Sequence, residues 1–356
     1  MRVAMGQFNE MTETQLQFAE QLGVSGVQMN LLRSSLPGDA VWAYDDLARL
    51  AERARAHGLR FEAIENVPVY FYDQVMLGLP GRDEQLENYR QIIRNVGRAG
   101  IPILGHHFMP NSVWRTPPRN GRGGARVTSF HEEELDARVE AEQLARVAQG
   151  RADVLERLRQ ATREPISEDQ MWSNYAYFLD AVLPVAEEAG VRLALHPDDP
   201  PVPELGGVAR LFRSVEGFKR GEELAKGSPA WGLDLCLGCC SEMPGGAANV
   251  RAMIEHFGPR GRIFYVHFRD VKGSVPSFDE CFIGEGNYDA PEVMRLLKRN
   301  GFTGFLLDDH VPHMVDDSDW NHRGRAHAIG YLQGILAALE LYESAIGEEG
   351  RQRVMA

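Results

Sequence analysis

The segment RIFYVHFRD, residues 262–270, is a short apolar run, rich in β-branched and aromatic residues, that carries a histidine near its end. Three further runs in the C-terminal half follow the same plan: VRLALHPDDP (191–200), WGLDLCLGCC (231–240) and TGFLLDDH (303–310). Short buried strands separated by helix-length segments are typical of βα units with a parallel sheet. We therefore expect these runs to be four consecutive strands of one such sheet.

At the end of the apolar part of each run lies a residue whose side chain commonly binds metal ions. These residues are His196, Cys236, His267 and Asp309. In parallel α/β folds the chemistry lies at the carboxyl ends of the strands, which meet at one face. Imidazole, thiolate and carboxylate groups are the usual donors for transition metals. The four residues are therefore predicted to hold one divalent ion. Asp308 is an alternative to Asp309, because one sequence does not settle the strand register.

Four earlier apolar runs complete a set of eight expected strands, at residues 2–8, 24–30, 59–66 and 101–109. Helical patterns lie between the strands, at residues 12–22, 43–56, 83–99, 168–189, 250–257, 290–300 and 323–344. Eight alternating units of this kind predict an α/β fold, a (β/α)₈ TIM barrel. A chain of 356 residues fits one such domain with insertions, so residues 1–356 are expected to form a single TIM-barrel domain.

One long segment, residues 110–168, separates the fourth expected strand from its helix. It begins with a stretch rich in Gly, Pro and Arg and continues as a charged helical pattern near residues 131–160. A connection this long inside a compact domain is usually functional or disordered. On a barrel it would emerge at the catalytic face, which predicts a lid or an interface arm. A tolerated surface insertion is the alternative.

Composition excludes several classes of partner. A formal net charge of −13 argues against nucleic acid or an anionic membrane surface. The segment MRVAMGQFNE (1–10) does not resemble a secretion signal, and no apolar run is long enough for a membrane-spanning helix.

Three of the four cysteines crowd at positions 236, 239 and 240, which is unlike a disulfide framework and lacks the second pair of a zinc knuckle. A reducing, cytoplasmic setting is expected, and Cys239, Cys240 and Cys281 are expected to be packing residues.

Several residues around the expected strand ends are candidates for catalysis. His310 directly follows Asp309 and could act as an acid or base. His313 and His322, in the following loop, could carry protons.

Other residues are candidates for substrate binding. Arg269 lies two residues after His267, and residues at that spacing on a strand share a face, so a cation would stand beside the metal. Arg115 in the long segment would be a second partner for a substrate carboxylate. The remaining candidates near the same face are Glu65, His107 and Glu280. Asp198 and Asp199 could orient a ligating histidine or cap the turn.

A family resemblance rests on several segments: IENVPV, GLPGRDEQLENYRQIIRNVGRAGIPIL, FMPNSVWRT, GGARVTSF, LHPDDPP, VHFRDVKGS and DDH. These resemble the mannonate dehydratases, metal-dependent TIM barrels of the xylose-isomerase-like superfamily. The resemblance implies a lyase that dehydrates D-mannonate to 2-keto-3-deoxygluconate with a divalent ion, usually Mn²⁺, with Fe²⁺, Co²⁺ or Mg²⁺ as alternatives. It also implies a homo-oligomer, a dimer or tetramer. The family's metal ligands fall on His196, Cys236, His267 and Asp309, and its acid/base histidine falls on His310.

The chain departs from the family pattern at three places. The family's catalytic tyrosine has no clear counterpart, because Tyr331 lies inside the last expected helix and His322 or Arg323 stands nearer the expected place. Asp279 lies in the segment after the seventh strand, and Val113 replaces an acidic residue before Trp114. Two alternatives therefore accompany the dehydratase prediction: a related metal-dependent epimerase, isomerase or lyase acting on a sugar or keto-sugar, and a sugar-acid binder without catalysis.

Overall fold

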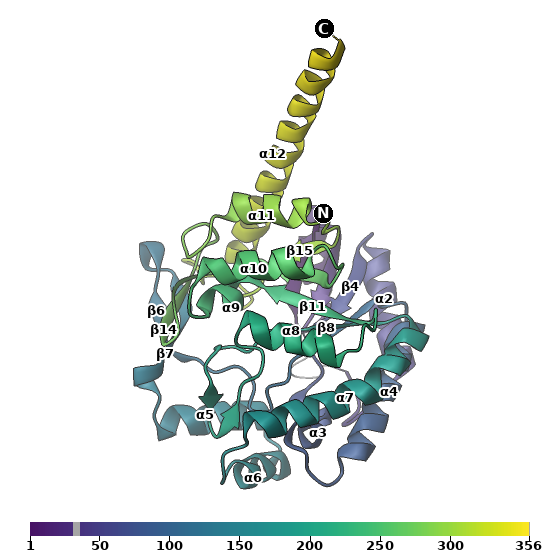
Figure 1. The fold of residues 1–356 in the computed structure, drawn as a ribbon, viewed down its shortest axis with the longest axis vertical. Helices are drawn as coiled ribbons and strands as arrows, with labels where there is room; N and C mark the ends of the chain where they lie inside the picture. Colours follow the sequence, from purple (N-terminus) through teal and green to yellow (C-terminus); the bar gives the residue numbers. More distant parts are fainter. Residues whose placement is uncertain (31–35, 356) are drawn as a thin grey trace.

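The computed structural model describes residues 1–30 and 36–355. At its centre is a parallel sheet closed into a barrel, with helices around it (Figure 1). Around the barrel the order is β1 (Arg2–Val3), β15 (Phe305–Leu307), β12 (Ile263–His267), β11 (Trp231–Cys236), β8 (Arg192–Leu195), β5 (Ile103–His106), β4 (Arg60–Ile64), β3 (Gly26–Met29) and β2 (Met5–Phe8). The predicted TIM barrel is confirmed.

The first strand closes the ring although it is interrupted. Only Ala4 separates β1 from β2, and the two segments pair with opposite ends of the sheet, β1 with β15 and β2 with β3. The backbone N–H of Ala4 itself donates to the carbonyl of Leu306 at 2.8 Å. The predicted strand at residues 2–8 is therefore one barrel stave with a break, and the eight expected strands are all present.

Alternation along the strands separates two apolar cores, because successive residues point to opposite faces. Outward residues such as Leu306 and Val266 join the large core under the helices. Inward residues, including Phe305 and Tyr265, form a smaller buried cluster inside the barrel, where these two rings stack at 5.0 Å. Toward the carboxyl ends of the strands the inward-facing residues become polar, and the candidate site lies there.

Most helices follow the predicted pattern. The helices that cover the barrel are α1 (Glu13–Gln21), α2 (Tyr44–Ala56), α4 (Arg82–Arg98), α7 (Glu168–Ala189), α8 (Val215–Leu224), α10 (Ala247–Phe257), α11 (Ala290–Arg299) and α12 (His322–Met355). Shorter elements are η1 (Val69–Phe71), α3 (Asp73–Leu77), α9 (Leu237–Glu242) and the strand pair β9 (Glu204–Leu205) and β10 (Val208–Ala209). Thr12 and Gln15 start α1 with a reciprocal capping box. Helix α8 was not predicted, and α12 extends beyond its predicted end and projects from the barrel (Figure 1).

The segment 110–168 is ordered as secondary structure and is joined to the barrel. It contains β6 (Thr116–Asn120), η2 (Arg122–Gly124), β7 (Arg126–His131), η3 (Glu132–Glu134), α5 (Ala137–Ala148) and α6 (Ala152–Ala161). Strands β6 and β7 continue into β14 (Ser277–Cys281) and β13 (Asp270–Ser274), which makes one antiparallel sheet of four strands. A small core that includes Trp114, Phe130 and Phe278 lies under it. Whether the insertion acts as a lid or an interface arm stays a prediction.

Across the described residues, no helix combines the length and the apolar character that crossing a membrane would require.

Candidate metal centre and active site

The ends of four neighbouring strands bring the predicted metal ligands together. Cys236 and His267 are the last residues of β11 and β12, His196 directly follows β8, and Asp309 lies two residues after β15. Cys236, His267 and Asp309 offer ligand atoms that all lie within 4.8 Å of one another. His196 belongs to overlapping groups with Cys236 and with His267, and its ring centroid lies 5.5 Å from that of His267. The described residues thus include a His, Cys and Asp group that could hold a divalent metal.

Asp308, the alternative ligand, has other partners. Its carboxylate accepts the backbone N–H of Gly6 at 3.0 Å and pairs with Arg325. Arg325 lies in α12, so Asp308 ties the last helix to the first strand. Asp309, rather than Asp308, lies in the His and Cys group.

The chemistry of this group fits a transition metal. Nδ1 of His267 is fully buried, has no hydrogen-bond partner among the described residues, and lies 3.8 Å from the Asp309 carboxylate. A buried ring nitrogen without a partner is costly, and a bound cation would satisfy it. Burial alone would raise the pKa of the Cys236 thiol, but hydrogen bonding from Cys239 and the charge of Arg269 hold that pKa well below its usual value. The thiolate form, which is the form that binds metals, is therefore favoured.

Two side chains that the sequence analysis missed support the group from the first strands. Gln7 in β2 donates to Glu65 and to Asp309, each at 2.9 Å, and so links the predicted substrate-binding carboxylate to a predicted ligand. Gln28 in β3 also donates to Glu65, at 2.8 Å. Gln7 has a positive φ of 62°, which is strained for a residue with a side chain and typical of functional sites.

Asp234 is a third missed residue. It lies two positions before Cys236 on β11, so both side chains face the barrel interior. Its carboxylate lies 3.5 Å from Nε2 of His267, is almost fully buried, and has no hydrogen-bond partner among the described residues. Burial raises the pKa of Asp234 to about 7, against the lowering effect of His267 and His196. The alternation in the sequence DLC was the signal that could have identified it.

His310 is held by a buried carboxylate. Its Nδ1 lies 2.8 Å from Oε1 of Glu280 on β14, which fixes the ring and leaves Nε2 for another partner. Burial alone would lower the pKa of His310, but the charges of Asp309 and Glu280 outweigh it and raise that pKa above its usual value. Glu280, predicted as a substrate-binding residue, is thus in contact with the predicted catalytic histidine.

The two arginines predicted to hold a substrate carboxylate are engaged within the protein. Arg115 donates to both carboxylate oxygens of Asp199, at 2.5 and 2.7 Å, and to Glu280 at 3.1 Å. Arg269 donates to Glu280 at 2.6 Å and to Asp199 at 3.3 Å. Burial would raise the pKa of Asp199, but the two guanidinium groups lower it to about 2. The predicted contact of either arginine with a substrate stays untested.

The three remaining predicted histidines lie in different surroundings. Nδ1 of His313 lies 2.5 Å from Oδ1 of Asn321 in the loop before α12. His107 is buried, its Nδ1 accepts the backbone N–H of Met109 at 3.2 Å, and burial lowers its pKa to about 3, so it is neutral. His322 begins α12 and packs edge-on against Phe18 and Trp320, with ring centroids 4.8 and 5.0 Å away. His322 is not among the described residues that line the cavity beside His310. Its predicted catalytic role stays untested.

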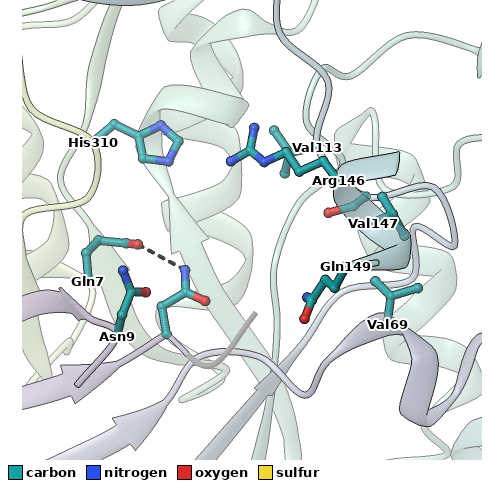
Figure 2. Close-up of a pocket in the computed structure, with 10 residues that line it drawn as sticks. Gln7, Asn9, Val69, Val113, Arg146, Val147, Gln149 and His310 are labelled. Carbon is teal, nitrogen blue, oxygen red and sulfur yellow. Dashed lines mark hydrogen bonds between the residues drawn. The ribbon is translucent and has the colours of Figure 1, made fainter. Parts of the chain in front are cut away.

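A cavity of about 280 Å³ lies between the barrel and the insertion (Figure 2). On the barrel side Gln7 and His310 line it, and on the other side Val113 and Arg146 do. Since Gln7 also donates to Asp309, the cavity adjoins the candidate metal group. An enclosed space with a few convergent polar groups beside titratable residues is the usual form of an active site.

Comparison with known proteins identifies the family. A family model described as D-mannonate dehydratase (UxuA) matches residues 1–345. The chain belongs to the D-mannonate dehydratase family. A mannonate dehydratase of Thermotoga neapolitana is 32% identical over 321 residues, covering 84% of this chain and 85% of that protein.

Solved structures agree with this assignment. The crystal structure of mannonate dehydratase from Streptococcus suis matches with a TM-score of 0.80 and 27% identity, covering 94% of this chain and 93% of that one. An L-ribulose 3-epimerase structure matches with a TM-score of 0.56 and 18% identity over 96% and 97% of the two chains, a likeness of fold alone. As a member of the mannonate dehydratase family, the chain is an enzyme of the hydro-lyase class.

Proposed function

We propose that this protein dehydrates D-mannonate to 2-keto-3-deoxygluconate with a divalent metal ion. The observation that carries the proposal is the group of Cys236, His267 and Asp309 beside a cavity lined by His310. The family relationship supplies the substrate, because the relative from Thermotoga neapolitana is named a mannonate dehydratase. The reaction removes the proton on the carbon next to the carboxylate and expels the hydroxyl group of the following carbon as water.

We propose that the metal is held by His196, Cys236, His267 and Asp309. Manganese is the preferred ion, with iron, cobalt or magnesium as alternatives. A thiolate ligand argues for a transition metal over magnesium, which prefers oxygen donors. When bound, such an ion supplies Lewis-acid polarisation of substrate oxygens, which acidifies the neighbouring C–H bond.

We propose that His310 is the acid that protonates the departing hydroxyl group. Glu280 fixes the ring through Nδ1, so Nε2 is the nitrogen that exchanges a proton with a substrate in the cavity. The charges of Asp309 and Glu280 raise the pKa of His310, which favours the protonated form that an acid requires. The buried ion pairs of Arg115 and Arg269 with Glu280 hold that carboxylate in place beneath the histidine.

The decisive experiment measures α-keto acid formation from D-mannonate by the purified protein loaded with Mn²⁺. His310→Asn should reduce kcat about 100- to 10,000-fold, the usual contribution of a general acid, while metal content stays unchanged. His57→Asn serves as the matched control, because His57 follows α2 and contacts Glu20 outside the site. An unchanged rate in His310→Asn would reject the assigned role.

His322→Asn, measured in the same assay, tests the second predicted catalytic histidine. A loss of rate comparable to that of His310→Asn would bring His322 into the reaction despite its packing against Phe18. A panel of keto-sugars run beside the sugar acids tests the alternative, an epimerase or isomerase. Turnover of a keto-sugar without any dehydration of an aldonate would replace the dehydratase proposal.

We also propose a cytoplasmic enzyme that forms homo-oligomers. The four cysteines are free and buried, which suits a reducing compartment. Light scattering on the purified protein measures the oligomeric state, and a monomer at micromolar concentration would contradict this part.

A further inference from the structure

The cavity raises the question of which residue receives the substrate's carboxylate. A carboxylate leaving water for a partly enclosed site needs a cationic partner, and a guanidinium group can bind it through two parallel hydrogen bonds. Arg115 and Arg269 are buried beneath the cavity and contact the protein's own carboxylates, Asp199 and Glu280. Neither is among the described residues that line the cavity.

Arg146 lies on the opposite wall. It belongs to the last turn of α5, in the insertion, and it is the one arginine or lysine among the described lining residues. Figure 2 shows its guanidinium group directed across the cavity toward the ring of His310. The residue is exposed, so a ligand entering from solvent can reach it. Val113 and Val147 line the wall near it, and such apolar neighbours strengthen an ion pair once a ligand covers the site.

We propose that Arg146 binds the carboxylate of the sugar-acid substrate and thereby makes the enzyme select acids over neutral sugars. The inference rests on the proposed function, since it assigns a specificity residue to that same cavity. The insertion then contributes directly to substrate recognition, because α5 carries the cation that binds the acid, while the barrel carries His310 and the metal group. A substrate spanning the cavity would meet Arg146 on one side and His310 on the other.

The substitution that isolates the charge is Arg146→Met. Methionine keeps an unbranched side chain and a high helix propensity, so α5 should form as before. Loss of a charge-assisted contact at an exposed position should weaken D-mannonate binding about 10- to 30-fold. Arg146→Lys keeps the charge but not the planar fork, and should give an intermediate value.

Binding is measured by calorimetry on the manganese-loaded protein in the His310→Asn background, so that no turnover interferes. D-Mannonate is compared with D-mannitol, a neutral polyol of the same carbon number. The expected result is a rise in Kd of about 10- to 30-fold for D-mannonate in Arg146→Met and no change for D-mannitol. Equal affinity for D-mannonate with and without Arg146 would overturn the proposal, and so would an equal loss for both ligands.

Arg138→Met is the matched control, because Arg138 lies on the same helix and pairs with Glu142 on the exposed face. It should bind D-mannonate like the parent protein. These measurements distinguish a failure of the proposed dehydratase function from a failure of the role assigned to Arg146. If the parent protein dehydrates no aldonate but binds D-mannonate through Arg146, the proposed function fails and the assignment of Arg146 stands.

Discussion

Two regions of the molecule meet at one cavity but are built differently. One is the set of carboxyl ends of strands β8, β11, β12 and β15, and the other is the insertion at residues 110–168. The four predicted metal ligands at the strand ends are at most 8% exposed, and neighbouring strands pair directly, as Cys236 does with His267. The insertion contributes Arg146, which is exposed. The insertion itself is joined to the barrel through an antiparallel sheet and a small apolar core. The rigid barrel thus carries the groups that need accurate geometry, and the appended layer carries a group that needs access to solvent.

The largest effect is expected on the barrel side. His267→Ala removes a predicted ligand whose Nδ1 and Nε2 face Asp309 and Asp234. Bound manganese, measured by elemental analysis, should be lost, and the dehydration rate should fall at least about 1,000-fold, since the metal's Lewis-acid contribution disappears. Cys281→Ser is the control, because Cys281 ends β14 and is not among the candidate metal ligands of the described residues. Retained metal with normal turnover would contradict the assigned site.

A smaller effect is expected when the insertion is loosened. Phe130→Ala empties a buried position in the small core between β7 and the barrel, which should cost about 3–5 kcal/mol locally. Hydrogen exchange should quicken within residues 110–168, and KM for D-mannonate should rise about tenfold because Arg146 is less well positioned. Manganese content should not change. Loss of the metal in this variant would show that the two regions are not separable.

The smallest effect is expected at a contact between β7 of the insertion and β14. Oδ1 of Asp279 on β14 lies 3.0 Å from Nε2 of His131 on β7. Burial would raise the pKa of Asp279, but hydrogen bonds from His131 and Ser129 lower it below its usual value. A lowered carboxyl pKa stabilises the folded state above the unfolded pKa near 4, and this contribution is lost as the pH falls through the folded pKa. Asp279→Asn should therefore cost at most about 1 kcal/mol at pH 7, since the pair is partly exposed.

Hydrogen exchange of β7, measured at pH 7 and near pH 3, checks this effect. The parent protein and Asp279→Asn should differ at pH 7 and converge at the acidic value. A difference that persists near pH 3 would mean that the carboxylate charge is not its source.

Long periodic features were predictable because local patterns determine them. The alternation of short apolar runs with helical segments indicated the barrel, and strand-end chemistry indicated His196, Cys236, His267 and Asp309, which do lie together. Helix α8 was missed because a long segment that contains β9 and β10 separates it from β8. The hairpin of β13 and β14 was missed because its pairing partner, β7, lies far earlier in the chain.

The sequence by itself determined the closed barrel and the donor types at its strand ends, because strand period and side-chain chemistry are local properties. Only the tertiary structure decided the partners of Arg115, Arg269 and Glu280 and the place of Arg146 opposite His310. Arg115 and Glu280, like Arg146 and His310, lie far apart in the chain, and their placement depends on how the insertion packs on the barrel. Desolvation and charge, which set the protonation states of the site, follow from that packing.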